Sequence, residues 1–163
     1  MKAKSGFTLV EILIVVVILG ILAAIVIPQF TEASTEAKTS SLVTDLQSMR
    51  SQILLYKIQH NDNLPGVING THTGAAGFVN SMIGKTDIFG NAYAITDTVS
   101  ATGDALYGPY LQKIPTNQFV DSDGVGTGTA EPAAVVTDGS QGWYFNTQIG
   151  KFSATDTAEH LLL

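Results

Sequence analysis

The chain opens with a long, nearly uninterrupted run of hydrophobic residues. Over residues 7–27 the one charged residue is Glu11. A helix of about 21 residues is roughly 30 Å long, which matches the hydrocarbon core of a membrane. Two lysines lie within the first four residues, and no further Lys or Arg follows before Lys38. This asymmetry predicts a single membrane-spanning helix whose N-terminus stays on the cytoplasmic side.

Beyond Pro28 the hydrophobic residues recur mostly at three- and four-residue steps, as in an amphipathic helix. The stripe consists of Phe30, Ala33, Ala37, Leu42, Leu46, Met49, Ile53 and Tyr56. No Pro or Gly occurs over residues 29–63, so the pattern predicts one helix over residues 7–60, ended by the turn-forming residues 61–66. Because Pro28 cannot donate a helical hydrogen bond, we expect the helix to bend or locally unwind between Gly20 and Pro28.

The rest of the chain breaks into short elements. Phe78, Val79, Met82 and Ile83 predict a short helix that stops at Gly84. Residues 86–98 predict either a strand pair or one strand with irregular flanks. Trp143–Asn146 and residues 149–152 predict a hairpin that turns through positions 147 and 148. These elements predict an α+β fold, in which the long helix packs on a small antiparallel β-sheet head.

Three further segments carry weaker patterns. Residues 69–74 predict a loop, because they are rich in Asn, Gly and Thr. Residues 108–115 contain two prolines and predict an irregular segment that pins aromatic and aliphatic side chains onto the sheet. The leucines at 161–163 predict an edge that packs on the core.

Glu11 is the unusual residue of the hydrophobic run. A carboxylate inside a membrane helix costs about 2.5 kcal/mol or more, and it usually marks a function. The carboxylate either reaches water at the interface or pairs with a cation at the same depth on a neighbouring chain. Cleavage after Gly6 would create such a cation, the α-amine of Phe7, and would leave the hydrophobic helix on the mature protein.

The sequence Gly6-Phe7-Thr8-Leu9-Val10-Glu11, followed by the apolar helix and Pro28, resembles the type IV pilin and type II secretion pseudopilin family. The resemblance covers about the first third of the chain. It implies that a prepilin peptidase cleaves after Gly6 and N-methylates Phe7, and that Glu11 pairs with the terminal amine of an adjacent subunit. Phe7, Glu11 and Pro28 are then the assembly residues, and the fold is expected to be pilin-like.

The expected division of the chain follows from this resemblance. Residues 1–6 form a cleaved leader, residues 7–28 a transmembrane and assembly helix, residues 29–61 an amphipathic helix that supports the head, and residues 62–163 the β-rich head. Residues 87–93 resemble an Asp-Pro-Trp-Gly-Asn-Pro-Tyr segment of major (G-type) pseudopilins, but both prolines are missing and Phe89 replaces the Trp. Residues 108–115 are similar to a segment of pseudopilin-like proteins.

Composition and motifs exclude several classes of function. The chain has 163 residues, a net charge of −6 and no cysteine. An acidic chain argues against nucleic-acid binding, and the lack of cysteine excludes a disulfide framework. The three histidines are dispersed, and no nucleophile or phosphate-binding motif is present, so we predict that the chain is not an enzyme.

One candidate metal site lies in the glycine-rich stretch 121–129. Asp121 and Asp123 offer the oxygen ligands that calcium prefers, with Glu131 and Asp138 nearby. The resemblance adds weight, since G-type pseudopilins carry calcium in a late loop. No acidic residue occupies the twelfth position of an EF-hand, and a solvated loop between strands is the alternative.

The resulting hypothesis is a filament subunit, a pseudopilin of a type II secretion system that polymerises through its N-terminal helix. Its expected partners are copies of itself, a prepilin peptidase, the inner-membrane assembly platform and minor pseudopilins. The chain is expected to sit in the inner membrane with its head in the periplasm. Two alternatives remain: the major pilin of an extracellular type IV pilus, and a singly anchored binding domain that never polymerises.

Overall fold

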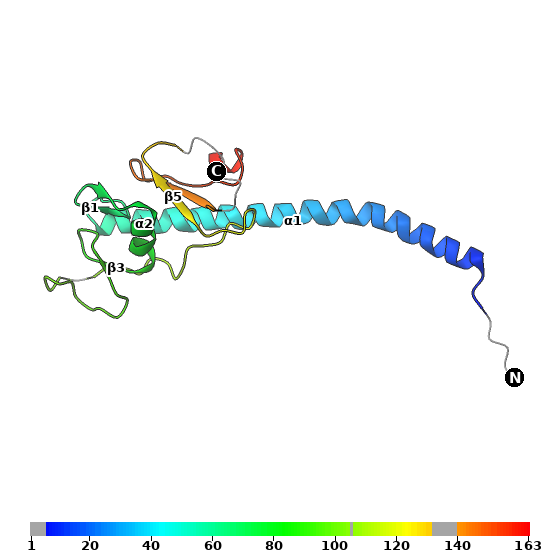
Figure 1. Cartoon of the computed structure of the whole chain (residues 1–163), viewed down its shortest axis with the longest axis horizontal. Helices are drawn as coiled ribbons and strands as arrows, with labels where there is room; N and C mark the ends of the chain where they lie inside the picture. The colour runs from blue at the N-terminus through cyan, green and yellow to red at the C-terminus, as the bar shows by residue number, and fades with distance from the viewer. Residues whose placement is uncertain (1–5, 105, 132–139) are drawn as a thin grey trace. The chain divides into compact units, whose positions relative to one another are not determined.

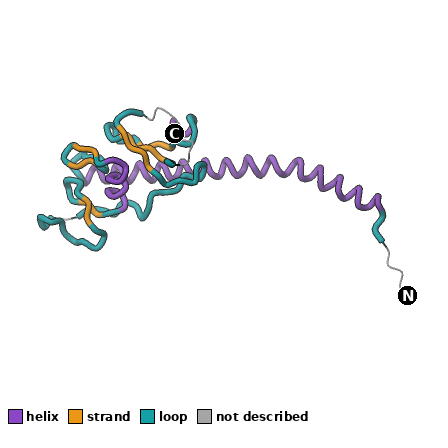
Figure 2. The backbone as a smooth tube through the Cα atoms, in the orientation of Figure 1, coloured by secondary structure: helices purple, strands orange, loops and turns teal. Residues whose placement is uncertain are grey.

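The computed structural model describes residues 6–104, 106–131 and 140–163 (Figures 1 and 2). The chain divides into two compact units, Met1–Ser40 and Ser41–Leu163. In chain order its elements are α1 (Leu9–Gln59), β1 (Val67–Ile68), β2 (Thr71–His72), α2 (Gly74–Ile83), β3 (Lys85–Thr86), β4 (Ala92–Tyr93), β5 (Val125–Gly128), β6 (Trp143–Asn146), β7 (Phe152–Ala154) and the 3-10 turn η1 (His160–Leu162).

The predicted long helix is confirmed. Helix α1 has 51 residues and continues through Pro28 without interruption. The missing N–H of Pro28 removes one helical bond, while the hydroxyl of Thr31 donates to the carbonyl of Ile27 at 2.8 Å. Helix is retained over residues 20–28 in the isolated chain, so the local unwinding expected there does not occur.

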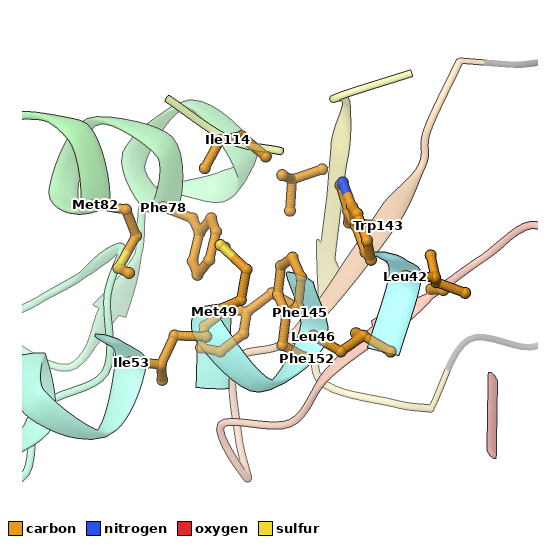
Figure 3. Close-up of a cluster of buried hydrophobic side chains, with 12 residues drawn as sticks. Leu42, Leu46, Met49, Ile53, Phe78, Met82, Ile114, Trp143, Phe145 and Phe152 are labelled. Carbon is orange, nitrogen blue, oxygen red and sulfur yellow. The ribbon is translucent and has the colours of Figure 1, made fainter. Parts of the chain in front are cut away.

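The core of the second unit is built on one face of α1. The buried residues of that face recur at three- and four-residue steps: Leu42, Leu46, Met49, Ile53 and Tyr56. Figure 3 shows four of these side chains meeting Phe78 and Met82 of α2 and the large aromatic side chains of β6 and β7. The first part of the predicted stripe, including Phe30, is exposed, so the prediction was wrong there and right from Leu42 onward.

A three-stranded sheet covers this core. Strands β6 and β7 are antiparallel, with Phe145 opposite Phe152, and β5 pairs with β6 in parallel. The predicted α+β class is confirmed, and the parallel pair is an addition to the antiparallel head that we expected. Residues 125–128 belong to the stretch for which a metal site or a solvated loop is expected, but they form β5, in which Val125 is buried and every residue pairs with β6.

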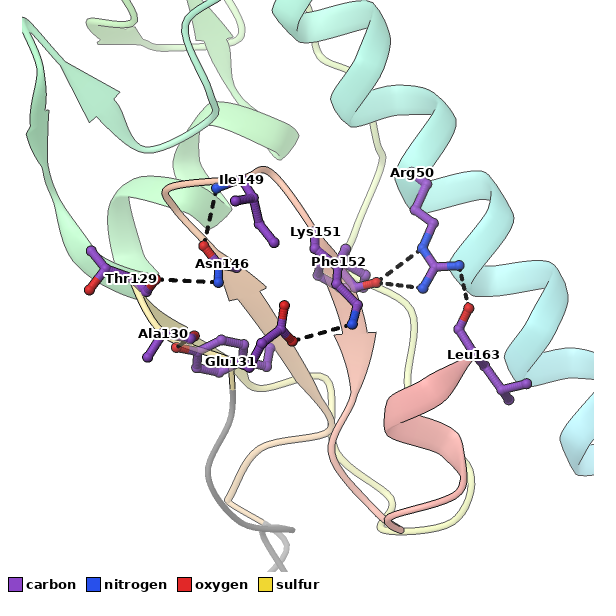
Figure 4. Close-up of polar contacts among 10 residues, drawn as sticks. Arg50, Thr129, Ala130, Glu131, Asn146, Ile149, Lys151, Phe152 and Leu163 are labelled. Carbon is purple, nitrogen blue, oxygen red and sulfur yellow. Dashed lines mark hydrogen bonds and ion pairs between the residues drawn. The ribbon is translucent and has the colours of Figure 1, made fainter.

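The predicted hairpin of β6 and β7 exists with a longer turn. The second strand begins at Phe152 rather than at residue 149. Figure 4 shows the reason: the side-chain oxygen of Asn146 accepts the backbone N–H of Ile149, and it also accepts that of Gln148. Gly150 then adopts a positive φ of 74°, which closes the turn.

Two shorter hairpins complete the second unit. Strands β1 and β2 are joined by Asn69 and Gly70, whose φ values of 49° and 77° are typical of a tight hairpin turn. The loop predicted over residues 69–74 was therefore wrong for β2. Strands β3 and β4 confirm the predicted strand pair over residues 86–98, although each strand has only two residues.

The segment 108–115 is irregular as predicted, and it contacts both the helices and the sheet, where the indole N–H of Trp143 in β6 donates to the carbonyl of Pro115 at 2.7 Å. The backbone N–H groups of Tyr110 and Leu111 both donate to the carbonyl of Met82 at the end of α2. The Tyr110 hydroxyl donates to Gln59 of α1 at 2.6 Å. Hydrogen bonds of the adjacent residues Tyr110 and Leu111 thus attach this segment to both α1 and α2.

The terminal leucines do not form an edge buried in the core. Leu162 is 85% exposed and Leu163 is 41% exposed. Instead, Figure 4 shows the guanidinium of Arg50 donating to the carbonyls of Leu163 and Phe152, at distances of 2.7 to 3.0 Å. The backbone of this segment is held by Arg50 while two of its leucine side chains face solvent.

Candidate assembly and processing site

Helix α1 begins with a reciprocal cap between Thr8 and Glu11. The Thr8 hydroxyl accepts the backbone N–H of Glu11 at 3.3 Å, and the Glu11 carboxylate accepts the backbone N–H and the hydroxyl of Thr8 at 2.8 and 2.7 Å. This is a capping box, in which two unsatisfied donors of the first helical turn find partners. The sequence signal of this cap is Thr-x-x-Glu before an apolar run. The role of Thr8 was not predicted from the sequence, although this signal indicates it.

Glu11 and the position of its predicted ion-pair partner, the amine of Phe7, both lie at the start of α1. Glu11 stands in the first turn of α1, where a negative charge is favoured by the helix dipole. Phe7 directly precedes the cap and is 84% exposed. The carboxylate is therefore presented at the same end of the helix as the amine that cleavage would create.

The processing position is accessible. Gly6 and Phe7 are exposed and lie outside any helix or strand. No atom lies within 4 Å of where a Cβ would stand on Gly6. Residues 1–5 of the predicted leader 1–6 lie outside the described residues, and cleavage after Gly6 stays a prediction.

The surface that follows the cap is unpartnered within the first unit. The exposed large side chains of α1 in this unit are Leu9, Val10, Ile12, Leu13, Ile14, Val15, Val16, Val17, Ile18, Leu19, Ile21, Leu22, Ile25, Val26, Ile27 and Phe30. By length and composition alone, α1 is able to cross a membrane. An apolar surface of this size needs a lipid or protein environment.

The predicted calcium residues do not form a metal site with other described residues. Asp121 and Asp123 are both exposed, and no group of three or more potential ligands occurs among the residues that the structure describes. Glu131 is instead paired with Lys151 at 3.2 Å (Figure 4). Asp138 lies outside the described residues. Calcium binding therefore stays a prediction.

A second carboxylate, Asp87, holds together the turn in residues 87–93, the segment that resembles G-type pseudopilins. It is 4% exposed, and it accepts the backbone N–H groups of Phe89 and Asn91, the Asn91 side-chain amide and the Tyr93 hydroxyl. Burial raises the pKa of Asp87, but these hydrogen bonds outweigh it and hold the pKa below its usual range. The group closes the β3–β4 turn and has a structural role.

Residues 1–27 match the family described as "Prokaryotic N-terminal methylation motif". The chain thus carries this motif at the position where the structure shows Gly6, Phe7 and the capped Glu11 at the start of α1. The match covers only the N-terminal segment, and no solved structure matches the chain.

The same region is similar to named proteins. It is 42% identical over 59 residues to a type II secretion system core protein G of Pseudomonas aeruginosa, covering 36% of this chain and 42% of that protein. A core protein G of Aeromonas hydrophila is 37% identical over 60 residues, covering 37% and 42%. A fimbrial protein of Pseudomonas aeruginosa is 43% identical over 51 residues, covering 31% and 33%. The chain spans less than half the length of these relatives.

Proposed function

We propose that this protein is a structural filament subunit, a pseudopilin of a type II secretion system. The observation that carries the proposal is the start of α1. There, an accessible Gly6–Phe7 bond and a capped Glu11 precede a wholly exposed apolar surface, within the segment that matches the methylation motif. The relatives named core protein G support the choice of secretion system.

The mechanism is assembly through the N-terminal helix. A prepilin peptidase cleaves after Gly6 and methylates the new amine of Phe7. In lipid the apolar side chains already have an apolar solvent, so burying them between helices adds little hydrophobic free energy. The bonds from Thr8 do not neutralise the charge of the Glu11 carboxylate, which is costly there, and an ion pair with the Phe7 amine of a neighbouring copy lowers that cost. This ion pair stabilises the association of the copies and fixes their register.

The membrane environment and the partners of the chain follow from this mechanism. The apolar part of α1 sits in the inner membrane before assembly, and the second unit lies in the periplasm. The partners are other copies of the chain, the prepilin peptidase, the assembly platform and minor pseudopilins. We propose no catalytic activity, because the chain's role is to form the filament that supports export.

The fimbrial relatives favour a second candidate, the major pilin of an extracellular type IV pilus. Location separates the two candidates. Sheared surface filaments that contain this chain would favour the pilus, and confinement to the periplasm would favour the secretion system. A singly anchored domain that never polymerises is the third candidate, in which Glu11 would have no partner.

The first experiment is the intact mass and N-terminal sequence of the protein from its native membrane. The proposal predicts a chain that begins at N-methylated Phe7. A chain that retains the residues before Phe7, in cells with an active prepilin peptidase, would contradict the proposal and favour the anchored domain. A matched variant, Gly6→Val, blocks the close approach of the backbone to the peptidase and should retain the leader.

A further inference from the structure

The tip of the β1–β2 hairpin carries a reactive dipeptide that the proposed assembly site does not use. Asn69 and Gly70 form the two-residue turn after β1 (Figure 1), and both are exposed. Asparagine is a thermolabile residue, because the backbone nitrogen that follows it can attack its side-chain amide. No other asparagine of the chain is followed by glycine.

The attacking atom, the backbone nitrogen of Gly70, is open to react. Among the described residues, neither the Gly70 N–H nor the side chain of Asn69 has a hydrogen-bond partner. No atom lies within 4 Å of where a Cβ would stand on Gly70. Because glycine has no Cβ and its backbone rotates freely, nothing at this position hinders ring closure onto the Asn69 side chain.

The hairpin gives little resistance to the backbone rotation that this attack requires. Strands β1 and β2 are joined by two residue pairs, of which Ile68 with Thr71 is the one next to the turn. Both residues of β2 are exposed, and no residue of either strand belongs to the buried hydrophobic cluster of the second unit. A segment with so few buried contacts opens locally at a low cost in free energy.

Asn61 is a matched reference within the same chain. It is exposed and has a φ of 51°, close to the 49° of Asn69. The nitrogen that follows it belongs to Asp62, which carries a side chain, and its N–H donates to the carbonyl of Lys57 at 3.0 Å. A nitrogen that is held in a hydrogen bond and crowded by a side chain attacks slowly, so we expect Asn61 to be stable where Asn69 is not.

The surroundings of the remaining asparagines protect them. Asn80 lies within α2, where helical hydrogen bonds hold the backbone nitrogen that follows it. The side-chain amides of Asn91, Asn117 and Asn146 donate to other groups, and the last two residues are almost fully buried. Asn63 precedes a leucine, whose side chain hinders attack. The structure thus leaves Asn69 as the reactive asparagine.

We propose that Asn69 is a site of spontaneous deamidation, which converts the β1–β2 turn into an isoaspartyl turn. The Gly70 nitrogen bonds to Cγ of Asn69, the Cγ–Nδ2 bond breaks, and Nδ2 leaves as ammonia with the proton from the Gly70 N–H. Water then opens the five-membered succinimide. Breaking its bond from nitrogen to Cγ gives aspartate, and breaking the bond from nitrogen to the original backbone carbonyl carbon gives isoaspartate.

The isoaspartyl product changes one surface of the second unit. Its main chain runs through the former side chain and is one carbon longer, so the turn no longer aligns Ile68 with Thr71. Both products add one negative charge at the exposed tip. Because neither product reverts to asparagine, the converted fraction increases with the time since synthesis. The inference does not depend on the proposed filament function, because the reaction takes place within one chain.

The test is peptide mass spectrometry of the full chain, stored in detergent micelles at neutral pH and sampled over time. Asn69 should lose its amide at least about tenfold faster than Asn61, which corresponds to a barrier difference of about 1.4 kcal/mol. Part of the product should accept a methyl group from a protein isoaspartyl methyltransferase, because direct hydrolysis of the amide gives no isoaspartate. In the converted chain, amide hydrogen exchange should increase in β1 and β2 and stay unchanged in β6.

The decisive variant is Asn69→Gln, which should lose the reaction because glutamine would have to close a six-membered ring. Asn61→Gln is the matched control and should convert at the native rate. Gly70→Ala should slow the conversion through its Cβ, even though alanine is strained at a φ of 77° and loosens the turn. The proposal is overturned if Asn69 converts no faster than Asn61, if no isoaspartate forms, or if Gly70→Ala does not slow the conversion.

Discussion

The capping box at the start of α1 leads to a prediction whose magnitude can be worked out. In Thr8→Val the hydroxyl is lost, and with it the bonds to the Glu11 carboxylate at 2.7 Å and from the Glu11 N–H at 3.3 Å. The backbone N–H of residue 8 remains as a donor to Glu11. Loss of an N-cap hydroxyl costs about 1 kcal/mol, so we expect the first turn to open about fivefold more often.

The assay is hydrogen exchange at the amide of Glu11 in detergent micelles. Thr8→Val should accelerate exchange at that amide, while the amides in the middle of α1 stay unchanged. Thr8→Ser is the control, because serine retains the hydroxyl and is an equally good cap. If the Val and Ser variants exchange alike, the reciprocal cap does not exist in the membrane-like environment, and our account of how Glu11 is positioned is wrong.

Three other perturbations test separate parts of the structure. Glu11→Gln removes the charge but not the size of the side chain, so sedimentation should show no filaments while membrane fractionation stays normal; intact filaments would contradict the pairing. Asp87→Asn should lower the free energy of unfolding at pH 7 by about 1–3 kcal/mol in urea titrations. Because the pKa of Asp87 is lowered in the fold, this stabilisation is present above about pH 4 and is lost as the pH falls through the folded-state pKa. The free energies of unfolding of the native chain and the variant should therefore converge in acid. An equal difference at all pH values would show that the charge of Asp87 is not the cause. If calcium binds, it should raise the melting temperature of the native chain and not that of Asp123→Ala. If a chelator changes the melting temperature of neither protein, the predicted calcium site does not exist.

Those parts of the candidate site that depend on neighbours in sequence were predictable. Gly6, Phe7 and Glu11 lie at the entry and in the first turn of α1, and their roles in processing and assembly, which the family resemblance implies, stay predictions. The cap by Thr8 was equally local, three residues from Glu11, and was readable from the Thr-x-x-Glu pattern. Pairing between copies involves a second chain, which is why Glu11 and the Phe7 amine remain proposals.

The sequence alone determined the long helix, because a hydrophobic run followed by helical periodicity is a property of adjacent residues. It also determined that the head would be built from short strands and a short helix. Only the tertiary structure decided which parts of the stripe are buried: Leu42 is buried in the core of the second unit, whereas Phe30 is exposed.

The tertiary structure also decided the contacts that join distant positions. The bond from His60 to Thr86 spans 26 residues, and those from Arg50 to the carbonyl of Phe152 span 102. The parallel pairing of β5 with β6 belongs to the same class. No local pattern encodes such contacts, because each depends on which surfaces the folded backbone brings together and on the need of buried polar groups for partners.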